Sequence, residues 1–324
     1  MAVGLNESGR SPAVDRWITF RPHAVRPRIH REGTARVFTE ATRYARVVVD
    51  DDGSVRTILP ADHPGIGDPA YRSERDAVAR AAAHHRWGDP APDIRYSESS
   101  EKCWRTMYSA LTERHQRKVH PELLRSADRL NLPADRIPQM REVSEVLRPL
   151  TGFEFSPAAG IVPLNEFYSP LADGVFQATQ FVRHHSQPLF SPEPDMAHEI
   201  IGHGTMLASD EFAEMYRIFG LTAKRLTMNQ SALRVLSRVF WYTMEYGVIS
   251  HSGEILACGA SLLSSYGELD EFQNAIMRPA DVDAMVEQEY GTHDYQPVLF
   301  FTESLDELMS FVTNFCADVS LLGS

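Results

Sequence analysis

The segment at residues 191–204, which reads SPEPDMAHEIIGHG, constrains the fold of this chain more than any other. Ser191 is a residue type that often caps a helix N-terminus, and Pro192 suits the first helical position. Glu193 and Asp195 follow, where acidic side chains complement the positive end of a helix dipole. We therefore predict a helix that starts at Ser191.

Two histidines lie in this predicted helix in an HExxxH arrangement: His198, followed by Glu199 in the second turn, and His203. Because glycines flank His203, we expect the helix to end there. The histidines of the HExxH motif are four residues apart and share one face, whereas five residues rotate by about 500°, or about 140° from eclipsed. The two imidazoles can therefore meet at one ion only if the helix unwinds at Gly202, which disfavours a zinc peptidase.

Residues 239–249, VFWYTMEYGVI, contain Glu245 as their only charge. The run is typical of a core helix, where an unpaired carboxylate is costly. Glu245 must then be protonated, paired with Arg234 or Arg238, or bound to a cation, and each histidine of the HExxxH segment could likewise be a hydrogen-bonded core residue. Taken together, two histidines and one carboxylate are typical of non-haem Fe(II) oxygenases.

Charge and cysteine content exclude several classes of protein. The 32 Lys and Arg against 44 Asp and Glu give a formal net charge of −12, which disfavours nucleic acid and anionic membranes as partners. The cysteines form no CxxC pair, which indicates reduced thiols rather than disulfides or a thiolate zinc cluster. No stretch suits a signal peptide or a membrane span, so we expect a cytoplasmic protein.

Helical periods broken by Pro and Gly turns predict a mainly α (α+β) domain over residues 58–324. Residues 1–57 are predicted to be an N-terminal arm that holds an arginine cluster between Arg10 and Arg36. An arm of this kind can engage an acidic partner, but a solvated segment lying against the acidic body is the simpler interpretation. We expect a β-hairpin from 44–49 and 55–59, helices at 73–86, 101–115, 143–150, 212–221 and 232–246, and a strand at 298–302.

Five segments resemble the pterin-dependent aromatic amino acid hydroxylases: ADHPGIGDPAYRSER at 61–75, QATQFVRHHSQP at 177–188, SPEPDMAHEIIGH at 191–203, FWYTMEYG at 240–247 and GASLLSSYGEL at 259–269. The resemblance runs in collinear order from about residue 58 to about residue 318 and is closest to minimal bacterial-type phenylalanine hydroxylases. It implies the catalytic fold of that family and a monomer. It also implies a monooxygenase that uses Fe(II), a tetrahydropterin such as tetrahydrobiopterin, and dioxygen as cosubstrate.

The same resemblance assigns roles to individual residues. The iron ligands would be His198, His203 and Glu245. The residues at the pterin would be Phe167, Gly160, Val162, Glu199 and Phe240. The residues at the substrate would be Arg183, which would hold the carboxylate, and Ser191, Pro192, Trp241, Ser261 and Ser264. The residues acting beside the reacting atoms would be Glu199, Tyr246 and Trp241.

Four departures from the family's usual residues bear on the substrate and the pterin: Tyr246 replaces Phe, Ser261 replaces Gly, Gln177 replaces His and Ser191 replaces Thr. The added bulk and hydroxyls at 246 and 261 predict that the substrate ring tilts and presents a meta carbon. Trp241 resembles the Phe and Tyr hydroxylases, so we expect phenylalanine to be converted to a para or meta tyrosine. The alternatives are tryptophan hydroxylation and a zinc metallohydrolase with Glu199 as general base.

Overall fold

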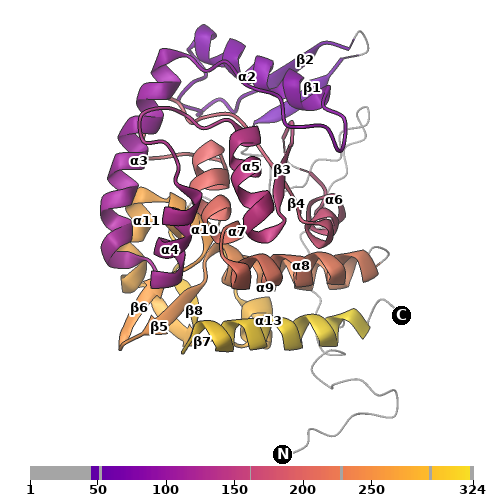
Figure 1. Ribbon diagram of the computed structural model, residues 1–324, viewed down its shortest axis with the longest axis vertical. Helices are drawn as coiled ribbons and strands as arrows, with labels where there is room; N and C mark the ends of the chain where they lie inside the picture. Colours follow the sequence, from indigo (N-terminus) through magenta and orange to yellow (C-terminus); the bar gives the residue numbers. More distant parts are fainter. Residues whose placement is uncertain (1–44, 51–52, 161, 227–228, 292–293, 322–324) are drawn as a thin grey trace, which may run out of the picture.

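A computed structural model describes residues 45–50, 53–160, 162–226, 229–291 and 294–321. The predicted N-terminal arginine cluster and Tyr44 lie outside these ranges. Within them the chain is mainly helical with small sheets, which confirms the predicted fold class (Figure 1). The helices are α2 (Pro69–Ala83), α3 (Glu98–Lys118), α4 (Pro121–Leu130), α5 (Met140–Thr151), α6 (Leu164–Tyr168), α7 (Thr205–Leu207), α8 (Asp210–Arg225), α9 (Gln230–Phe240), α10 (Ala260–Ser264), α11 (Tyr266–Glu271), α12 (Val282–Glu287) and α13 (Leu305–Ser320).

Short turns of other helix types interrupt or extend these helices. Two are 3₁₀-helices, η2 (Ser169–Asp173) and η5 (Phe272–Asn274). Two are π-helices, η3 (His198–Gly204) and η4 (Trp241–Glu245). Each π-helix continues an α-helical turn, and the sequence did not predict either of them. Both contain residues that we expected to bind a metal.

The strands of the described ranges form two pairs and one sheet of four strands. The antiparallel hairpin joins β1 (Arg46–Val49) to β2 (Val55–Ile58), and the parallel pair joins β3 (Glu154–Pro157) to β4 (Val175–Ala178). The larger sheet has the order β6-β5-β8-β7, with β5 at Val248–His251, β6 at Glu254–Ala257, β7 at Ile276–Pro279 and β8 at Val298–Thr302. Only β8 of this sheet was predicted.

Local sequence signals set the helix ends. Asp68 caps α2, its side chain accepting from the N–H groups of Ala70 and Tyr71, and Pro69 follows at the first helical position. This cap starts α2 four residues before the predicted helix at 73–86. The predicted helices at 101–115, 143–150 and 212–221 lie within α3, α5 and α8. The predicted helix at 232–246 covers both α9 and η4, which are helices of two different types.

Helix α8 packs closely against η2 and against α13, which lies beside it in Figure 1. Gly220 of α8 makes the close crossing possible, because a Cβ there would lie 2.1 Å from the backbone nitrogen of Ala172. At the other end of the molecule the hairpin packs on α2, where the N–H of Thr57 donates to Asp76 at 2.5 Å. Among the described residues, no helix combines the length and the apolar character that crossing a bilayer needs.

Candidate metal centre

The helix that carries the two histidines begins later than predicted. The residues from Ser191 to Asp195 are not helical, so the prediction of a helix start at Ser191 is wrong. The Ser191 hydroxyl donates instead to the carbonyl of Glu193 within its own loop, at 2.5 Å. Asp195 takes the capping place, since its Oδ1 accepts from the N–H of His198 at 3.4 Å. Asp195 therefore caps the helix in place of Ser191, although the Ser-Pro sequence is typical of a helix start.

Glu193 also differs from its predicted role, because a buried ion pair rather than the helix dipole accounts for its carboxylate. Its Oε1 lies 2.6 Å from Nη1 of Arg75 in α2, and its Oε2 accepts from the N–H of Ala45 at 2.9 Å. Burial raises the pKa of Glu193, but Arg75 and the hydrogen bonds to the carboxylate outweigh it and bring the pKa to about 2. This pair ties the β-hairpin and α2 to the loop that precedes the histidines.

The π-helix η3 brings His198 and His203 together. A π-helix bonds residue i to residue i+5, so residues five apart lie one above the other. The Nε2 atoms of the two histidines are 3.0 Å apart, with the rings perpendicular. The predictions that the helix ends at His203, and that it must unwind at Gly202, are therefore wrong. Gly202 has a packing role instead, because a Cβ there would lie 2.6 Å from the carbonyl oxygen of Ala260.

Glu245 completes the group from the end of the second π-helix, where the N–H of Tyr246 donates to the carbonyl of Trp241, five residues back, at 2.9 Å. Its Oε1 lies 3.2 Å from Nε2 of His203, and its Oε2 lies 3.6 Å from Nε2 of His198. The three side chains that the sequence singled out therefore converge.

The arginines that could have paired with Glu245 bind elsewhere. Arg238 donates to the carbonyl of Gln288 at 2.5 Å, and Arg234 donates to Ser231 at 3.1 Å. The interpretation of Glu245 as the partner of either arginine is therefore wrong. The carboxylate faces the histidines, as a metal ligand would.

The second ring nitrogen of each histidine is held by a hydroxyl. Nδ1 of His198 lies 3.1 Å from Oγ of Ser264, whose own proton is donated to the carbonyl of Ala260 at 2.9 Å. Oγ must therefore accept from Nδ1–H, which leaves the Nε2 lone pair free. Nδ1 of His203 lies 2.6 Å from the hydroxyl of Tyr216 in α8. Partners of this kind orient metal-binding imidazoles and fix their tautomer.

The protonation states also suit a cation. Burial raises the pKa of Glu245, but the attraction of His203 and the hydrogen bonds from His203 and Ser261 outweigh it and bring the pKa to about 2. Burial lowers the pKa of His198 to about 4, against the opposing effect of Glu245. At neutral pH the carboxylate is therefore charged and His198 is neutral, which are the forms that bind a metal.

Glu199 lies beside the first histidine but does not join the ion-pair group. Its Oε1 accepts from the N–H of Thr179 at 3.3 Å and from the hydroxyl of Thr179 at 3.2 Å. Burial raises its pKa to about 7, so near neutral pH this carboxyl can hold or release a proton. Its ligand atom still lies within 4.8 Å of those of the two histidines.

Arg183 is buried and its guanidinium is paired with Asp195. Nε and Nη2 donate to the two carboxylate oxygens at 2.9 and 2.8 Å, and the Arg183 N–H donates to the same carboxylate at 2.8 Å. Burial raises the pKa of Asp195, but Arg183 outweighs it and lowers it. Among the hydrogen bonds of the described residues, Nη1 donates to none, so this nitrogen is the one that can take a further carboxylate.

Two of the predicted pterin residues, Phe167 and Phe240, are neighbours. Phe167 in α6 is half-buried, with its ring perpendicular to those of Phe176 and Phe240 at centroid distances of 5.5 and 6.1 Å. Gly160 and Val162 lie in the loop before α6, and Gly160 approaches the hairpin. The Phe167 ring is therefore held by perpendicular contacts with neighbouring aromatic rings.

Trp241, which was predicted at the substrate, packs against two other rings. It is tilted against Tyr246 at a centroid distance of 4.8 Å and stacked on Tyr290 at 4.4 Å. Ser261 in α10 donates to Oε2 of Glu245 at 2.9 Å, so the hydroxyl that departs from the family's glycine touches the candidate metal ligand. Pro192 is half-buried in the loop before η3. The side-chain amide of Gln177 donates to the carbonyl of Glu166.

Sequence reasoning missed several supporting residues. Tyr216, Thr179 and Tyr290 contact the predicted site residues, and of these only Thr179 lies in a segment that the sequence analysis singled out for its family resemblance. Ser264 was predicted at the substrate, and the structure places its hydroxyl on His198. Among the supporting residues, Asp195 could have been predicted from its local sequence, because Asp is a residue type that often caps a helix and it lies just before the first histidine.

Comparisons of the sequence with known proteins point to one family. The family of biopterin-dependent aromatic amino acid hydroxylases matches residues 43–321, a range that includes the hairpin. The phenylalanine 3-hydroxylase of Streptomyces coeruleorubidus is 41% identical over 266 residues, which cover 81% of this chain and 95% of that protein. The tyrosine 3-monooxygenase of Bos taurus is 39% identical over 265 residues, and the chain spans 54% of its length.

Solved structures give the same result. Phenylalanine hydroxylase from Chromobacterium violaceum bound to cobalt superposes with a TM-score of 0.69 at 25% identity, over 76% of this chain and 91% of that one. Phenylalanine hydroxylase from Legionella pneumophila superposes with a TM-score of 0.64 at 28% identity, over 72% and 95%. Both the fold and the sequence are therefore similar to those of aromatic amino acid hydroxylases.

Proposed function

The chain belongs to the family of biopterin-dependent aromatic amino acid hydroxylases, and from this premise we propose that it hydroxylates free L-phenylalanine at the meta carbon with Fe(II) as its metal. The single observation that carries the proposal is the convergence of His198, His203 and Glu245 within 3.0–3.6 Å of one another. The choice of phenylalanine is supported by the phenylalanine 3-hydroxylase that is 41% identical over nearly its whole length.

The three donors fit a single metal ion. Ligand bonds of about 2.0–2.2 Å separate neighbouring donor atoms by roughly 3 Å, which matches the observed spacing. Two imidazoles and one carboxylate leave open positions for further ligands, the arrangement used by non-haem Fe(II) oxygenases. Bound Fe(II) and tetrahydrobiopterin would supply the redox chemistry that places one oxygen atom of dioxygen on an aromatic ring.

The remaining residues would bind and orient the two organic molecules. Arg183 would hold the substrate carboxylate through Nη1 while Asp195 fixes the guanidinium plane. Phe167 would stack on the pterin, with its own ring held by the perpendicular contacts to Phe176 and Phe240. Glu199 would form a hydrogen bond with the pterin and exchange a proton with it, because its pKa of about 7 makes the protonated and the charged carboxyl both available near neutral pH.

The proposed meta selectivity rests on two side chains at the substrate wall. Ser261 adds a hydroxyl and a Cβ beside Glu245, and Tyr246 packs on Trp241. Because Ser261 occupies space that a glycine would leave empty, the substrate ring would lie farther from Glu245. In that position the ring would present its meta carbon to the open side of the metal. The same wall supports an amino acid with one six-membered ring as the substrate.

Aerobic turnover tests the proposal. Purified enzyme is supplied with Fe(II), tetrahydrobiopterin and phenylalanine, tyrosine or tryptophan in turn, and the products are identified by NMR. We expect meta-tyrosine from phenylalanine, with oxygen and pterin consumed in step. Para-tyrosine alone would refute the meta assignment. Hydroxylation of tryptophan or tyrosine in preference to phenylalanine would refute the substrate assignment, and activity with Zn²⁺ but no oxygen uptake would favour the metallohydrolase.

Two further parts of the proposal concern the state of the protein. We propose a monomer, to be measured by light scattering, and a cytoplasmic location. The location is supported by Cys103, Cys258 and Cys316, all of which are buried and unpaired. The division of the chain at residues 57 and 58 into an arm and a catalytic domain remains a prediction.

A further inference from the structure

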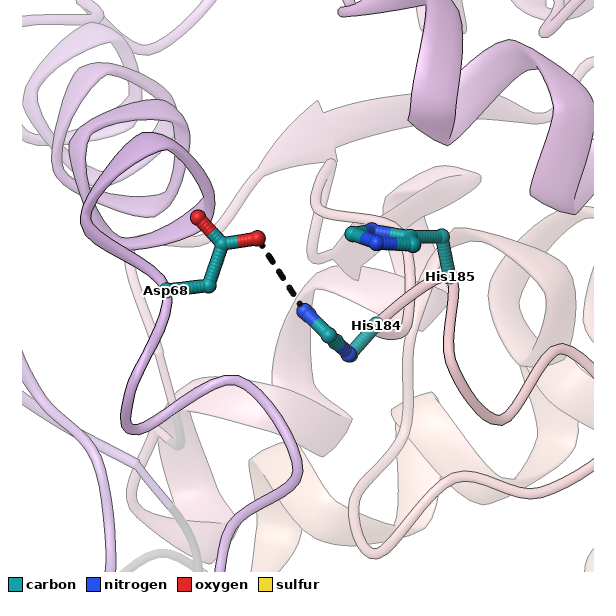
Figure 2. A group of neighbouring side chains, drawn as sticks. All are labelled: Asp68, His184 and His185. Atoms are coloured by element: carbon teal, nitrogen blue, oxygen red, sulfur yellow. Dashed lines mark hydrogen bonds and ion pairs between the residues drawn. The ribbon is translucent and has the colours of Figure 1, made fainter.

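A second group of two histidines and one carboxylate lies apart from the candidate metal centre. It consists of Asp68, at the start of α2, and of His184 and His185, which follow Arg183 (Figure 2). One ligand atom from each residue lies within 4.8 Å of the other two. We propose that this group is a peripheral site for one divalent transition-metal ion of the Zn²⁺ type, independent of the reaction proposed above.

Asp68 is already oriented as a ligand. Its Oδ1 accepts from the N–H groups of Ala70 and Tyr71 at 2.9 and 3.1 Å, which fixes the plane of the carboxylate. Its Oδ2 then points at His184, with 3.3 Å between this oxygen and Nε2. The side chain of Asp68 is 30% exposed, so water or an ion can reach Oδ2.

His184 is buried, and both of its ring nitrogens are committed. Nδ1 accepts from the N–H of Ser186 at 3.3 Å and lies 2.7 Å from the Ser186 hydroxyl, which places the ring proton on Nε2, facing Oδ2 of Asp68. A metal ion between Nε2 and Asp68 would take the place of that proton. Nδ1 would then carry the ring proton and donate to the Ser186 hydroxyl, as the second nitrogen does in known metal sites. The T-shaped contact between His184 and Tyr71, at 4.9 Å, holds the ring in this orientation.

His185 supplies the third ligand from an exposed position. Its ring centroid is 4.2 Å from that of His184, and Figure 2 shows it on the same side of the Asp68 carboxylate. Three ligands at about 2.0–2.2 Å from one ion lie roughly 3–3.5 Å apart. The Asp68–His184 pair already satisfies this spacing, and the exposed His185 side chain can close the remaining gap by a small rotation.

The chemistry of the donors selects the class of ion. Imidazole suits Zn²⁺, Ni²⁺ and Cu²⁺, whereas Mg²⁺ and Ca²⁺ prefer oxygen donors alone. Three protein ligands at a partly exposed position leave room for water as a further ligand. A bound ion would join the N-terminus of α2 to the segment that follows Arg183.

Counting bound ions tests this site. Metal-free protein is dialysed against micromolar Zn²⁺, and the zinc bound per chain is measured by mass spectrometry. We expect two ions in the unchanged chain, and one in His185→Gln. The variant His203→Gln, which disables the candidate metal centre, should also bind one, and the double variant should bind none. Exposed His84, whose Nδ1 faces the carbonyl of Arg80, gives the matched control: His84→Gln should bind two.

A second variant keeps the test independent of folding defects. Asp68→Asn preserves the cap of α2, because Asn caps a helix as well as Asp does, but it removes the charged ligand. It should bind one ion. Zinc should also raise the Tm of the His203→Gln variant and should not do so after His185→Gln is added. One ion in the unchanged chain, or two in both His185→Gln and Asp68→Asn, would overturn the proposal.

Discussion

Ser261 is expected to act in two separable ways, which a pair of substitutions can distinguish. Its hydroxyl donates to Oε2 of Glu245 at 2.9 Å, and its Cβ occupies space beside that carboxylate. Ser261→Ala removes the hydrogen bond and keeps the Cβ, whereas Ser261→Gly removes both. The hydrogen bond should therefore govern metal affinity, and the Cβ should govern where the substrate ring lies.

The magnitude for metal affinity follows from the hydrogen bond. A hydrogen bond to a charged group contributes about 1.5–3 kcal/mol, and supporting residues around metal ligands typically change affinity about 10–100-fold. The side chain of Glu245 is 12% exposed, so water can replace the serine only in part. We expect the metal Kd of both variants to rise about tenfold, the lower end of that range.

The assay combines competition with a chelator, which gives the metal Kd, and NMR of the product from phenylalanine. Ser261→Ala should bind metal more weakly and still form meta-tyrosine, while Ser261→Gly should bind as weakly and form more para-tyrosine. Glycine within α10 costs about 1 kcal/mol of helix stability, so Tm is measured for both. An unchanged Kd in Ser261→Ala, or the same product ratio in both variants, would show that the reasoning is wrong.

Two further predictions concern supporting residues. Tyr216→Phe removes the 2.6 Å bond to Nδ1 of His203 with little change in volume; we expect the metal Kd to rise about 10–100-fold by chelator competition, and an unchanged value would contradict the supporting role. Burial raises the pKa of Glu268 from 4.5 to about 7, although the N–H of Gln296 opposes this. The folded state then binds protons more tightly than the unfolded state, so stability is full below pH 4.5 and falls by roughly 3 kcal/mol as pH rises through 7. Urea unfolding should show a loss that is roughly 3 kcal/mol larger in the unchanged chain than in Glu268→Gln, where Glu199, with its own pKa of about 7, still contributes; equal pH dependence of the two would refute the prediction.

Residue types and periodicity revealed the candidate metal ligands and five of the helices, namely α2, α3, α5, α8 and α9. Glu245 stood out because a charge in a core run needs a partner, and the structure supplies two imidazoles. The long helices α3 and α8 were found from their apolar spacing, since each buries one face.

The features that the sequence did not reveal depend on backbone geometry and on distant contacts. The helical register of His198 and His203 was wrong because the calculation assumed 3.6 residues per turn, and a π-helix changes that spacing. The strands β5 and β6 were missed although Ser252 and Gly253, both with positive φ, form the turn between them; the Ser-Gly pair was the available signal. Ser191 does not cap the helix because Asp195 accepts from the N–H of His198 instead. Glu193 does not serve the helix dipole because its carboxylate pairs with Arg75, which is distant in the sequence.

The convergence of three side chains on one ion is tested most directly by crystals of the Fe(II)-loaded enzyme, with an anomalous difference map collected at the iron edge. We expect an iron peak about 2.0–2.3 Å from Nε2 of His198, Nε2 of His203 and a carboxylate oxygen of Glu245. An iron peak that lies elsewhere, or one from which the Glu245 carboxylate is absent, would contradict the proposed centre.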